Sequence, residues 1–161
     1  MLTIIRNYTL DDIGKGIKYL LGKASEAPEV RMLAIEITSG SEDPISAIYD
    51  WVKTHVHYVP DPVSGTDTIE LFISPVRMVK DFNAGTTIGG DCDDIALLIT
   101  ALYRSIGIQA NMVLIDQTGH GYDHAYCEVF SEKLGKWINS DPSAPQFPLG
   151  WNIKAFAKIT I

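Results

Sequence analysis

Cys92 is the residue best placed to act as a nucleophile, because it stands at or next to the start of a predicted helix. The unpaired N–H groups and the dipole at a helix start favour a thiolate over a thiol. The carboxylates of Asp91, Asp93 and Asp94 oppose that ionisation, although acidic residues are also common in the first turn of a helix. The position therefore predicts a reactive cysteine, and the alternative is a small residue packed near a helix start.

A histidine that could carry its proton, His124, begins a run of residues typical of a β-strand. Side chains alternate between the two faces of a strand, so His124 and Tyr126 share one face and Cys127 takes the other. Cys127 is therefore expected to be a packed thiol. The other histidines lie at the end of a predicted helix or in loops, which makes His124 the candidate.

An acidic partner for His124 follows from a predicted hairpin whose second strand, Lys136–Ser140, ends next to Asp141. A symmetric five-residue turn would place Asp141 opposite Ala125, on the wrong face of the sheet. We therefore predict a bulge near Gly135 that shifts the register by one residue. With that shift, the carboxylate can orient the imidazole and stabilise its protonated form. Taken alone, an Asp-Pro pair is also typical of a turn.

The elements that must position these groups include several helices, located by caps and apolar periodicity. The central helix starts near Cys92, has an apolar stripe up to Ile106 and ends at Gly107. Thr9 or Asp11 is expected to cap the first helix. That first helix has its apolar stripe at Ile13–Leu21. The other predicted helices are a helix-compatible stretch over residues 29–37, the helix Pro44–His55 that follows Asp43, and the short helix Pro75–Val79 that follows Ser74. The segment Val59–Ile73, with two prolines and a glycine, is predicted to be a loop.

After Gly107 the pattern changes to short runs rich in β-branched and aromatic residues. The predicted strands are Ala110–Ile115, Asp123–Phe130, Lys136–Ser140 and Ile153–Ile161. Helices first and strands later, without βαβ alternation, predict an α+β fold. In it, N-terminal helices and a central Cys-bearing helix pack on a C-terminal antiparallel β-sheet.

The composition restricts the classes of partner and location. The 161 residues suit a single domain, 1–161, and a hydrophobic share of 46% supplies its core. The net charge is −7 and no window collects Lys and Arg, so neither nucleic acid nor an anionic membrane is an expected partner. No apolar run approaches the roughly 20 residues of a membrane span, and no secretion signal is visible. Two cysteines form no disulfide framework, so we expect a reducing, cytoplasmic location.

The order of Cys92, His124 and Asp141, together with the sequence around each, resembles the transglutaminase-like superfamily of papain-related cysteine enzymes. The resemblance covers about residues 44–145. The segments that carry it are Ile48-Tyr49-Asp50-Trp51-Val52 with Tyr58, Gly90-Asp91-Cys92-Asp93-Asp94 with the helix after it up to Ala110, His124-Ala125-Tyr126-Cys127-Glu128-Val129, and Trp137-Ile138-Asn139-Ser140-Asp141-Pro142. The doubled acid after Cys92, with Tyr58-Val59-Pro60-Asp61-Pro62 and Ser74-Pro75, is similar to small members encoded by tailed phages and prophages.

In that family the cysteine attacks an amide or ester carbonyl, the histidine moves the proton and the aspartate holds the histidine. The resemblance implies these roles for Cys92, His124 and Asp141. It thus implies a cysteine-dependent acyl-transfer enzyme that forms a thioester. Hydrolysis of a protein or peptide substrate, as by a peptidase or amidase, is favoured over transamidation because water is the default acyl acceptor.

Two features depart from the family pattern. Tyr126 stands where the family often has Trp, which makes it a candidate for the oxyanion or substrate site. No side chain is clearly the donor to the oxyanion. The backbone N–H of Cys92 can supply one donor, and Trp51, His57 or Tyr58 can supply or position another.

Two other functions compete with an enzyme. One keeps the fold without the chemistry, as a binding or structural module, for example one associated with a virion and with phage assembly proteins. The acidic residues around Cys92 slightly favour it, because they oppose thiolate formation. In that case the location would be the virion instead of the cytoplasm.

The other alternative is a metal site. His55 and His57 lie two residues apart, but no Cys or His pair supplies the rest of a zinc site. The resemblance allows calcium, because some transglutaminase-like enzymes use it and carboxylates are abundant near Cys92. No loop has the spacing of an EF-hand. We therefore expect no cofactor and no metal ligand, with calcium as the one option.

Overall fold

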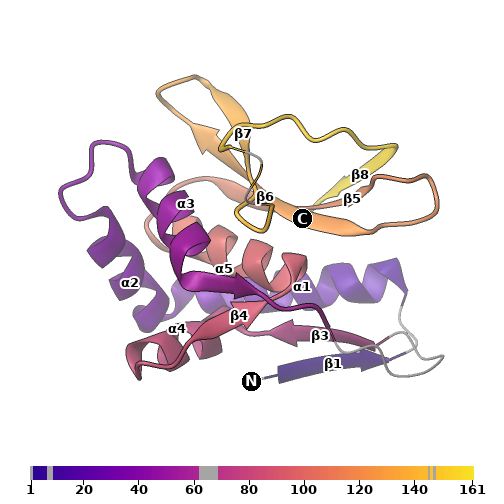
Figure 1. Cartoon of the computed structure of the whole chain (residues 1–161), viewed down its shortest axis with the longest axis horizontal. Helices are drawn as coiled ribbons and strands as arrows, with labels where there is room; N and C mark the ends of the chain where they lie inside the picture. The colour runs from indigo at the N-terminus through magenta and orange to yellow at the C-terminus, as the bar shows by residue number, and fades with distance from the viewer. Residues whose placement is uncertain (1, 7–8, 62–68, 145, 147) are drawn as a thin grey trace.

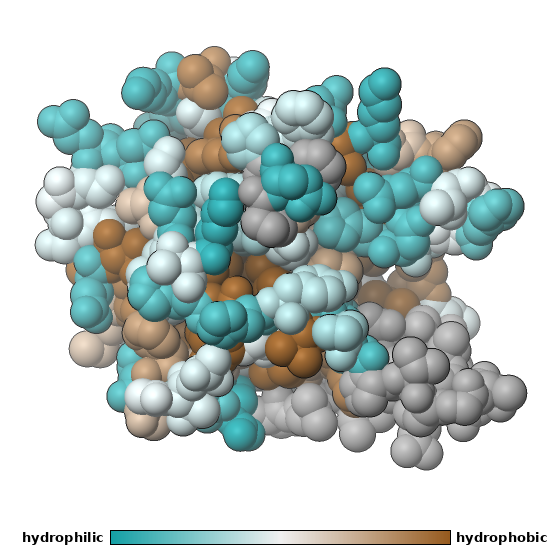
Figure 2. Space-filling model, viewed as in Figure 1, coloured by the Kyte–Doolittle hydropathy of each residue, from teal (hydrophilic) through white to brown (hydrophobic). Residues whose placement is uncertain are grey.

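The computed structural model describes residues 2–6, 9–61, 69–144, 146 and 148–161. A four-stranded sheet lies on one side of the helices, and two smaller sheets lie toward the other side (Figure 1). In the same view, hydrophilic side chains cover much of the sheet layer, and apolar side chains show between that layer and the elements below it (Figure 2). Within the described ranges, no helix is both long and apolar enough to span a bilayer.

Local capping explains where the helices begin. Thr9 and Asp12 form a capping box ahead of the first helix, and Asp43 accepts the Ser46 N–H at the start of the third. The helices are α1 (Leu10–Glu26), α2 (Pro28–Thr38), α3 (Pro44–His55), α4 (Pro75–Asn83) and α5 (Cys92–Ser105). Each predicted helix is confirmed, and α4 continues past its predicted end at Val79.

Three sheets are formed by the described strands. The strands are β1 (Leu2–Arg6), β2 (Val56–Tyr58), β3 (Ile69–Ile73), β4 (Ile88–Gly90), β5 (Ala110–Asp116), β6 (His124–Ser131), β7 (Lys136–Ser140) and β8 (Ala157–Thr160). The large sheet has the order β7-β6-β5-β8 with all neighbours antiparallel. A parallel β2–β4 pair and an antiparallel β1–β3 pair complete the set.

Helix α5 lies at the centre of the core. Every residue from Asp93 to Tyr103 is buried, because the large sheet packs on one side of α5 and α1, α2 and α3 pack around the rest. Met112 and Cys127 belong to the sheet face that shares this core. The Tyr103 hydroxyl donates to the Ile45 carbonyl oxygen at 3.0 Å and lies 3.0 Å from the Ser140 hydroxyl oxygen. The predicted α+β fold, with the Cys-bearing helix on an antiparallel sheet, is confirmed.

Sequence reasoning was wrong where strands pair across long separations. Ile69–Ile73, predicted as the end of a loop, forms β3 and pairs with β1, which was not predicted. The β2–β4 pair was also missed, since three-residue strands have no alternation to detect. Residues 62–68 of the predicted loop lie outside the described residues. Of the predicted strand Ile153–Ile161, only Ala157–Thr160 pairs as β8.

The β6–β7 hairpin has the register that the sequence argument required. Cys127 pairs with Ser140 and Ser131 pairs with Lys136. In this register Asp141, which follows Ser140, comes opposite Tyr126 instead of Ala125, on the sheet face that carries His124. The shift comes from a four-residue turn rather than from the predicted bulge. Gly135 ends that turn with φ +64°, a left-handed conformation that glycine adopts without strain.

Candidate active site

Cys92 is the first residue of α5, and the chain reaches it through β4. Asp91 is the N-cap and accepts the Asp93 N–H at 3.3 Å. A Cβ at Gly90 would lie 2.5 Å from Asp94 Cβ, and one at Gly89 would lie 2.8 Å from a backbone oxygen of β2. The two glycines therefore allow the close approach that sets the nucleophile at the helix start.

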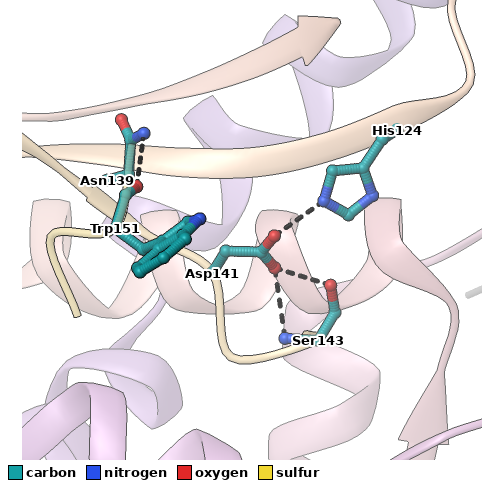
Figure 3. Close-up of polar contacts among 5 residues, drawn as sticks. All are labelled: His124, Asn139, Asp141, Ser143 and Trp151. Atoms are coloured by element: carbon teal, nitrogen blue, oxygen red, sulfur yellow. Dashed lines mark hydrogen bonds and ion pairs between the residues drawn. The ribbon is translucent and has the colours of Figure 1, made fainter. Parts of the chain in front are cut away.

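His124 lies between Cys92 and Asp141. Its Nε2 is 2.7 Å from Asp141 Oδ2 (Figure 3), and its ring also interacts with the Cys92 side chain. Since Nε2 faces Asp141, Nδ1 is the nitrogen left for Cys92. The other carboxylate oxygen of Asp141 accepts the Ser143 N–H at 3.2 Å and its hydroxyl at 2.6 Å. The structure thus brings the three predicted residues together, and Ser143, which sequence reasoning missed, holds Asp141 in place.

The environment of His124 favours its protonated form. Burial alone would lower the pKa of the ring, but the hydrogen bond that the ring donates to Asp141, together with the interaction with Cys92, outweighs burial and raises the pKa of His124 to about 10. Cys127 differs: complete burial raises the pKa of its thiol to about 12. Cys127 is therefore a packed thiol, as predicted.

A cleft of about 460 Å³ opens beside Cys92 and His124. Its apolar lining is Leu10, Ile13, Ile17, Phe72, Leu114 and Ala125, and its polar lining includes Asp91, Asp93, Asp123, Tyr58 and Tyr122. A larger cavity of about 670 Å³ lies between the start of α3 and the β6–β7 turn, and none of the three predicted catalytic residues lines it. The smaller cleft is therefore the candidate substrate site.

Of the four residues predicted around the oxyanion or substrate, Tyr58 lines this cleft, and the other three do not. Tyr58 lines it, and its pKa is raised by burial and then by the charge of Cys92. Trp51 instead stacks on His55 and packs against Phe82. His57 is exposed on β2 and does not line the cleft.

Tyr126 lies behind the histidine instead of in the cleft. It is 3% exposed and packs with Val113 and Ile115 on the outer sheet face. Its ring stacks on the His124 ring, with 6.3 Å between the two ring centroids. Tyr126 can therefore support the orientation of the imidazole without touching a substrate in the cleft.

Asp94, a predicted opponent of the thiolate, is buried and bound elsewhere. Its Oδ1 accepts the Ile73 N–H at 2.6 Å, which ties α5 to β3. Burial raises the pKa of Asp94 to about 8, and the negative charges of Asp91 and Asp61 act in the same direction. The hydrogen bond from Ile73 lowers the pKa but does not outweigh burial. At neutral pH Asp94 is therefore mostly protonated and opposes the thiolate little.

The acidic residues at the start of α5 are a weak fit to calcium. Asp91, Asp93 and Asp94 can bring one oxygen each within 4.8 Å of one another. Calcium takes six to eight oxygen ligands, and Asp94 is largely neutral at pH 7. Of the histidines considered for zinc, His55 hydrogen-bonds through Nδ1 to the Trp51 backbone oxygen at 2.8 Å.

Several residues of the cleft were missed at the sequence level. The apolar wall comes partly from α1, which lies outside the segments that carried the resemblance. Tyr122 and Asp123 also line the cleft. Their position directly before His124 is the one signal that could have identified them.

Comparison with known proteins identifies the family and the fold of the chain. A sequence model of the transglutaminase-like superfamily matches residues 31–142, more than half of the chain. The chain belongs to the transglutaminase-like superfamily. Among curated proteins, no significant sequence match was found.

Solved structures share the fold at low sequence identity. A candidate cysteine protease from Cytophaga hutchinsonii aligns with 98% of this chain and 53% of its own, at 20% identity and TM-score 0.57. A candidate protease from Parabacteroides distasonis aligns over 78% of this chain and 25% of its own, at 14% identity and TM-score 0.53. The chain thus spans about half or less of the length of these proteins.

Proposed function

We propose that this protein is a cysteine-dependent acyl-transfer enzyme that hydrolyses amide bonds in peptides or proteins through a thioester on Cys92. The observation that carries the proposal is the His124 imidazole, which is hydrogen-bonded to Asp141 and interacts with Cys92, at a cleft that both Cys92 and His124 line. Two solved structures with the same fold are described as candidate proteases, which supports the same class of reaction.

The proposed reaction begins from the thiolate and imidazolium pair. The Cys92 sulfur attacks the amide carbonyl carbon, and the carbonyl π electrons move onto its oxygen. As the C–N bond breaks, His124 Nδ1 gives its proton to the leaving amine. Water then attacks the thioester and gives a proton to His124, and the thiolate leaves to restore the pair. Asp141 holds the ring and stabilises its positive charge throughout.

The tetrahedral oxyanion needs hydrogen-bond donors in the cleft. The Cys92 backbone N–H is one candidate, because it belongs to the first turn of α5, where N–H groups lack helical acceptors. Tyr58 is the candidate for the second donor, since among Trp51, His57 and Tyr58 it is the one that lines the cleft. These groups account for the reaction without a cofactor, so we expect activity to persist in a chelator.

Trapping of the thioester tests this proposal. The protein is mixed with an activated peptide ester at acidic pH, quenched, and examined by mass spectrometry of its peptides. We expect an acyl adduct on Cys92, with none in Cys92→Ala and none on Cys127, and loss of peptide-amide hydrolysis in the same variant. Hydrolysis that survives in Cys92→Ala contradicts the proposal.

The alternative, a catalytically silent binding module, gives no adduct and no turnover in the same experiment. The expectations of a phage or prophage origin, and of cytoplasmic or virion location, stay predictions. The genes that flank the coding sequence and fractionation of producing cells test them.

A further inference from the structure

Each of the two residues proposed to react is directly preceded by an aspartate that lines the cleft. Asp91 precedes Cys92, and Asp123 precedes His124. One oxygen of each carboxylate is fixed by a backbone N–H, from Asp93 at 3.3 Å for Asp91 and from Gln117 at 3.0 Å for Asp123. Among the described residues, Oδ2 of Asp91 and of Asp123 has no hydrogen-bond partner. Both carboxylates are therefore oriented, yet keep one oxygen available to a substrate.

The loop that carries Asp123 is rigidly built. The buried carboxylate of Asp116 accepts three loop N–H groups, from Thr118, Gly119 and Gly121, at 3.0, 2.6 and 3.2 Å. The Asp123 N–H in turn donates to the carbonyl oxygen of Ile115, near the end of strand β5, at 3.0 Å. Asp123 is thus held at the edge of the cleft before a substrate arrives, which lowers the cost of binding.

The charges of the cleft have one sign. Its described lining includes no lysine or arginine, and the thiolate–imidazolium pair of the proposed function is neutral as a whole. Asp91 and Asp123 therefore leave a net negative field over the reacting atoms. An anionic side chain next to the scissile carbonyl would be repelled, and a cationic one attracted.

The remaining lining suits the long stem of a basic side chain. Ile13 and Leu114 offer apolar surface inside the cleft, against which the methylene groups of Lys or Arg can pack. Tyr58 and Tyr122 also line the cleft, and the two residues are 56% and 39% exposed. Aromatic faces at this position attract cations as well.

Resting on the proposed acyl transfer, we infer that the enzyme selects acyl donors with a lysine or arginine side chain next to the scissile carbonyl. The aliphatic stem packs on the apolar wall of the cleft, and the cationic head binds between the free oxygens of Asp91 and Asp123. The cation belongs to the substrate that acylates Cys92 and not to an amine that accepts the acyl group.

The test uses one series of peptide amides that differ only at that residue, with Arg, norleucine or Glu, assayed with chelator present. Arginine is chosen because its guanidinium is not an acyl acceptor under these conditions. We expect kcat/KM for Arg to exceed that for norleucine about tenfold, the worth of one charge-assisted hydrogen bond. The Glu peptide is expected to be the poorest substrate, and the Arg preference to shrink with added salt.

Isosteric variants locate the preference. Asp123→Asn and Asp91→Asn keep the acceptor oxygen for the backbone N–H, and Asn is as good an N-cap as Asp. Each is expected to lower the Arg-to-norleucine ratio several-fold. Asp50→Asn, an exposed residue of α3 outside the cleft, makes the same change of net charge and is expected to leave the ratio unchanged.

The outcomes separate this inference from the function on which it rests. Turnover of all three peptides at similar kcat/KM overturns the inference and leaves the proposed function intact. No turnover of any peptide overturns both. An Arg preference that requires added Ca²⁺, or that Asp50→Asn reduces as much as Asp123→Asn, also overturns it, because the acids then act as metal ligands or through the total charge alone.

Discussion

His124 depends on both of its neighbours for its charge. Burial opposes the imidazolium, and Asp141 and Cys92 restore it, so that its pKa rises to about 10. Asp141 can do this because Ser143 fixes its second oxygen and the carboxylate is 5% exposed. Cys92, His124 and Asp141 were predicted from residue type, chain order and hairpin register. Ser143 could not be, because its contact depends on the path of the chain after β7.

Asp141→Asn is expected to move the alkaline side of the pH–rate profile. The amide cannot stabilise the imidazolium as a carboxylate does, so the pKa of His124 falls and the ring loses its proton at lower pH. We expect kcat to fall about 100-fold near neutral pH. We also expect the alkaline limb of the kcat/KM profile to shift to lower pH. Full pH profiles of both proteins check this. An unchanged alkaline limb would mean that another acid holds His124.

At the scale of elements, the start of α5 is where the chain is most tightly constrained. β4 runs beside β2, and its last residue, Gly90, touches Asp94 of the helix that follows. Helices were predictable, because their caps and periodicity are local in sequence. The β1–β3 pairing was not, since β3 has its partner at the other end of the N-terminal half. The contribution of α1 to the cleft was missed for the same reason: it depends on how distant elements pack.

Gly90→Ala tests this constraint. Its new Cβ would lie 2.5 Å from Asp94 Cβ, so the start of α5 must shift. We expect the free energy of unfolding to fall by about 1–3 kcal/mol, together with slower alkylation of Cys92. Chemical denaturation and labelling measure the two effects. The control, Gly22→Ala at an exposed position of helix α1, meets no atom within 4 Å and should stabilise the protein by about 0.5–1 kcal/mol. Equal effects of the two substitutions would contradict the close packing.

Asp94→Asn tests the tie between α5 and β3. The pKa of Asp94 is raised by folding from 3.8 to about 8, so its stabilising contribution is complete below pH 3.8 and is lost as pH rises through 8. The stability of the parent protein relative to the variant should therefore decline from pH 4 to pH 8. We expect a relative change of at least about 1.4 kcal/mol, the free energy of one pKa unit. Urea denaturation at both pH values measures it, and parallel pH dependence in the two proteins would place Asp94 in contact with solvent.

At the scale of the whole molecule, one sheet edge and one helix start meet to form the site. α5 supplies the nucleophile from the centre of the core, and the sheet that covers it supplies the histidine and the aspartate. The order of helices and strands predicted this arrangement, because a single antiparallel sheet can cover a central helix in few ways. The cleft itself required the structure, as its walls come from segments that are spread along the chain from Leu10 to Ala125.

The measurement that tests the account most directly is the pH dependence of cysteine alkylation by iodoacetamide, followed for each cysteine by mass spectrometry. We predict that Cys92 reacts at pH 6, where an ordinary thiol reacts slowly, while the buried Cys127 is not labelled in the same sample. In His124→Ala, labelling of Cys92 should require a more alkaline pH. Equal or absent labelling of the two cysteines, or a Cys92 profile that is the same in His124→Ala, would contradict a thiolate–imidazolium pair.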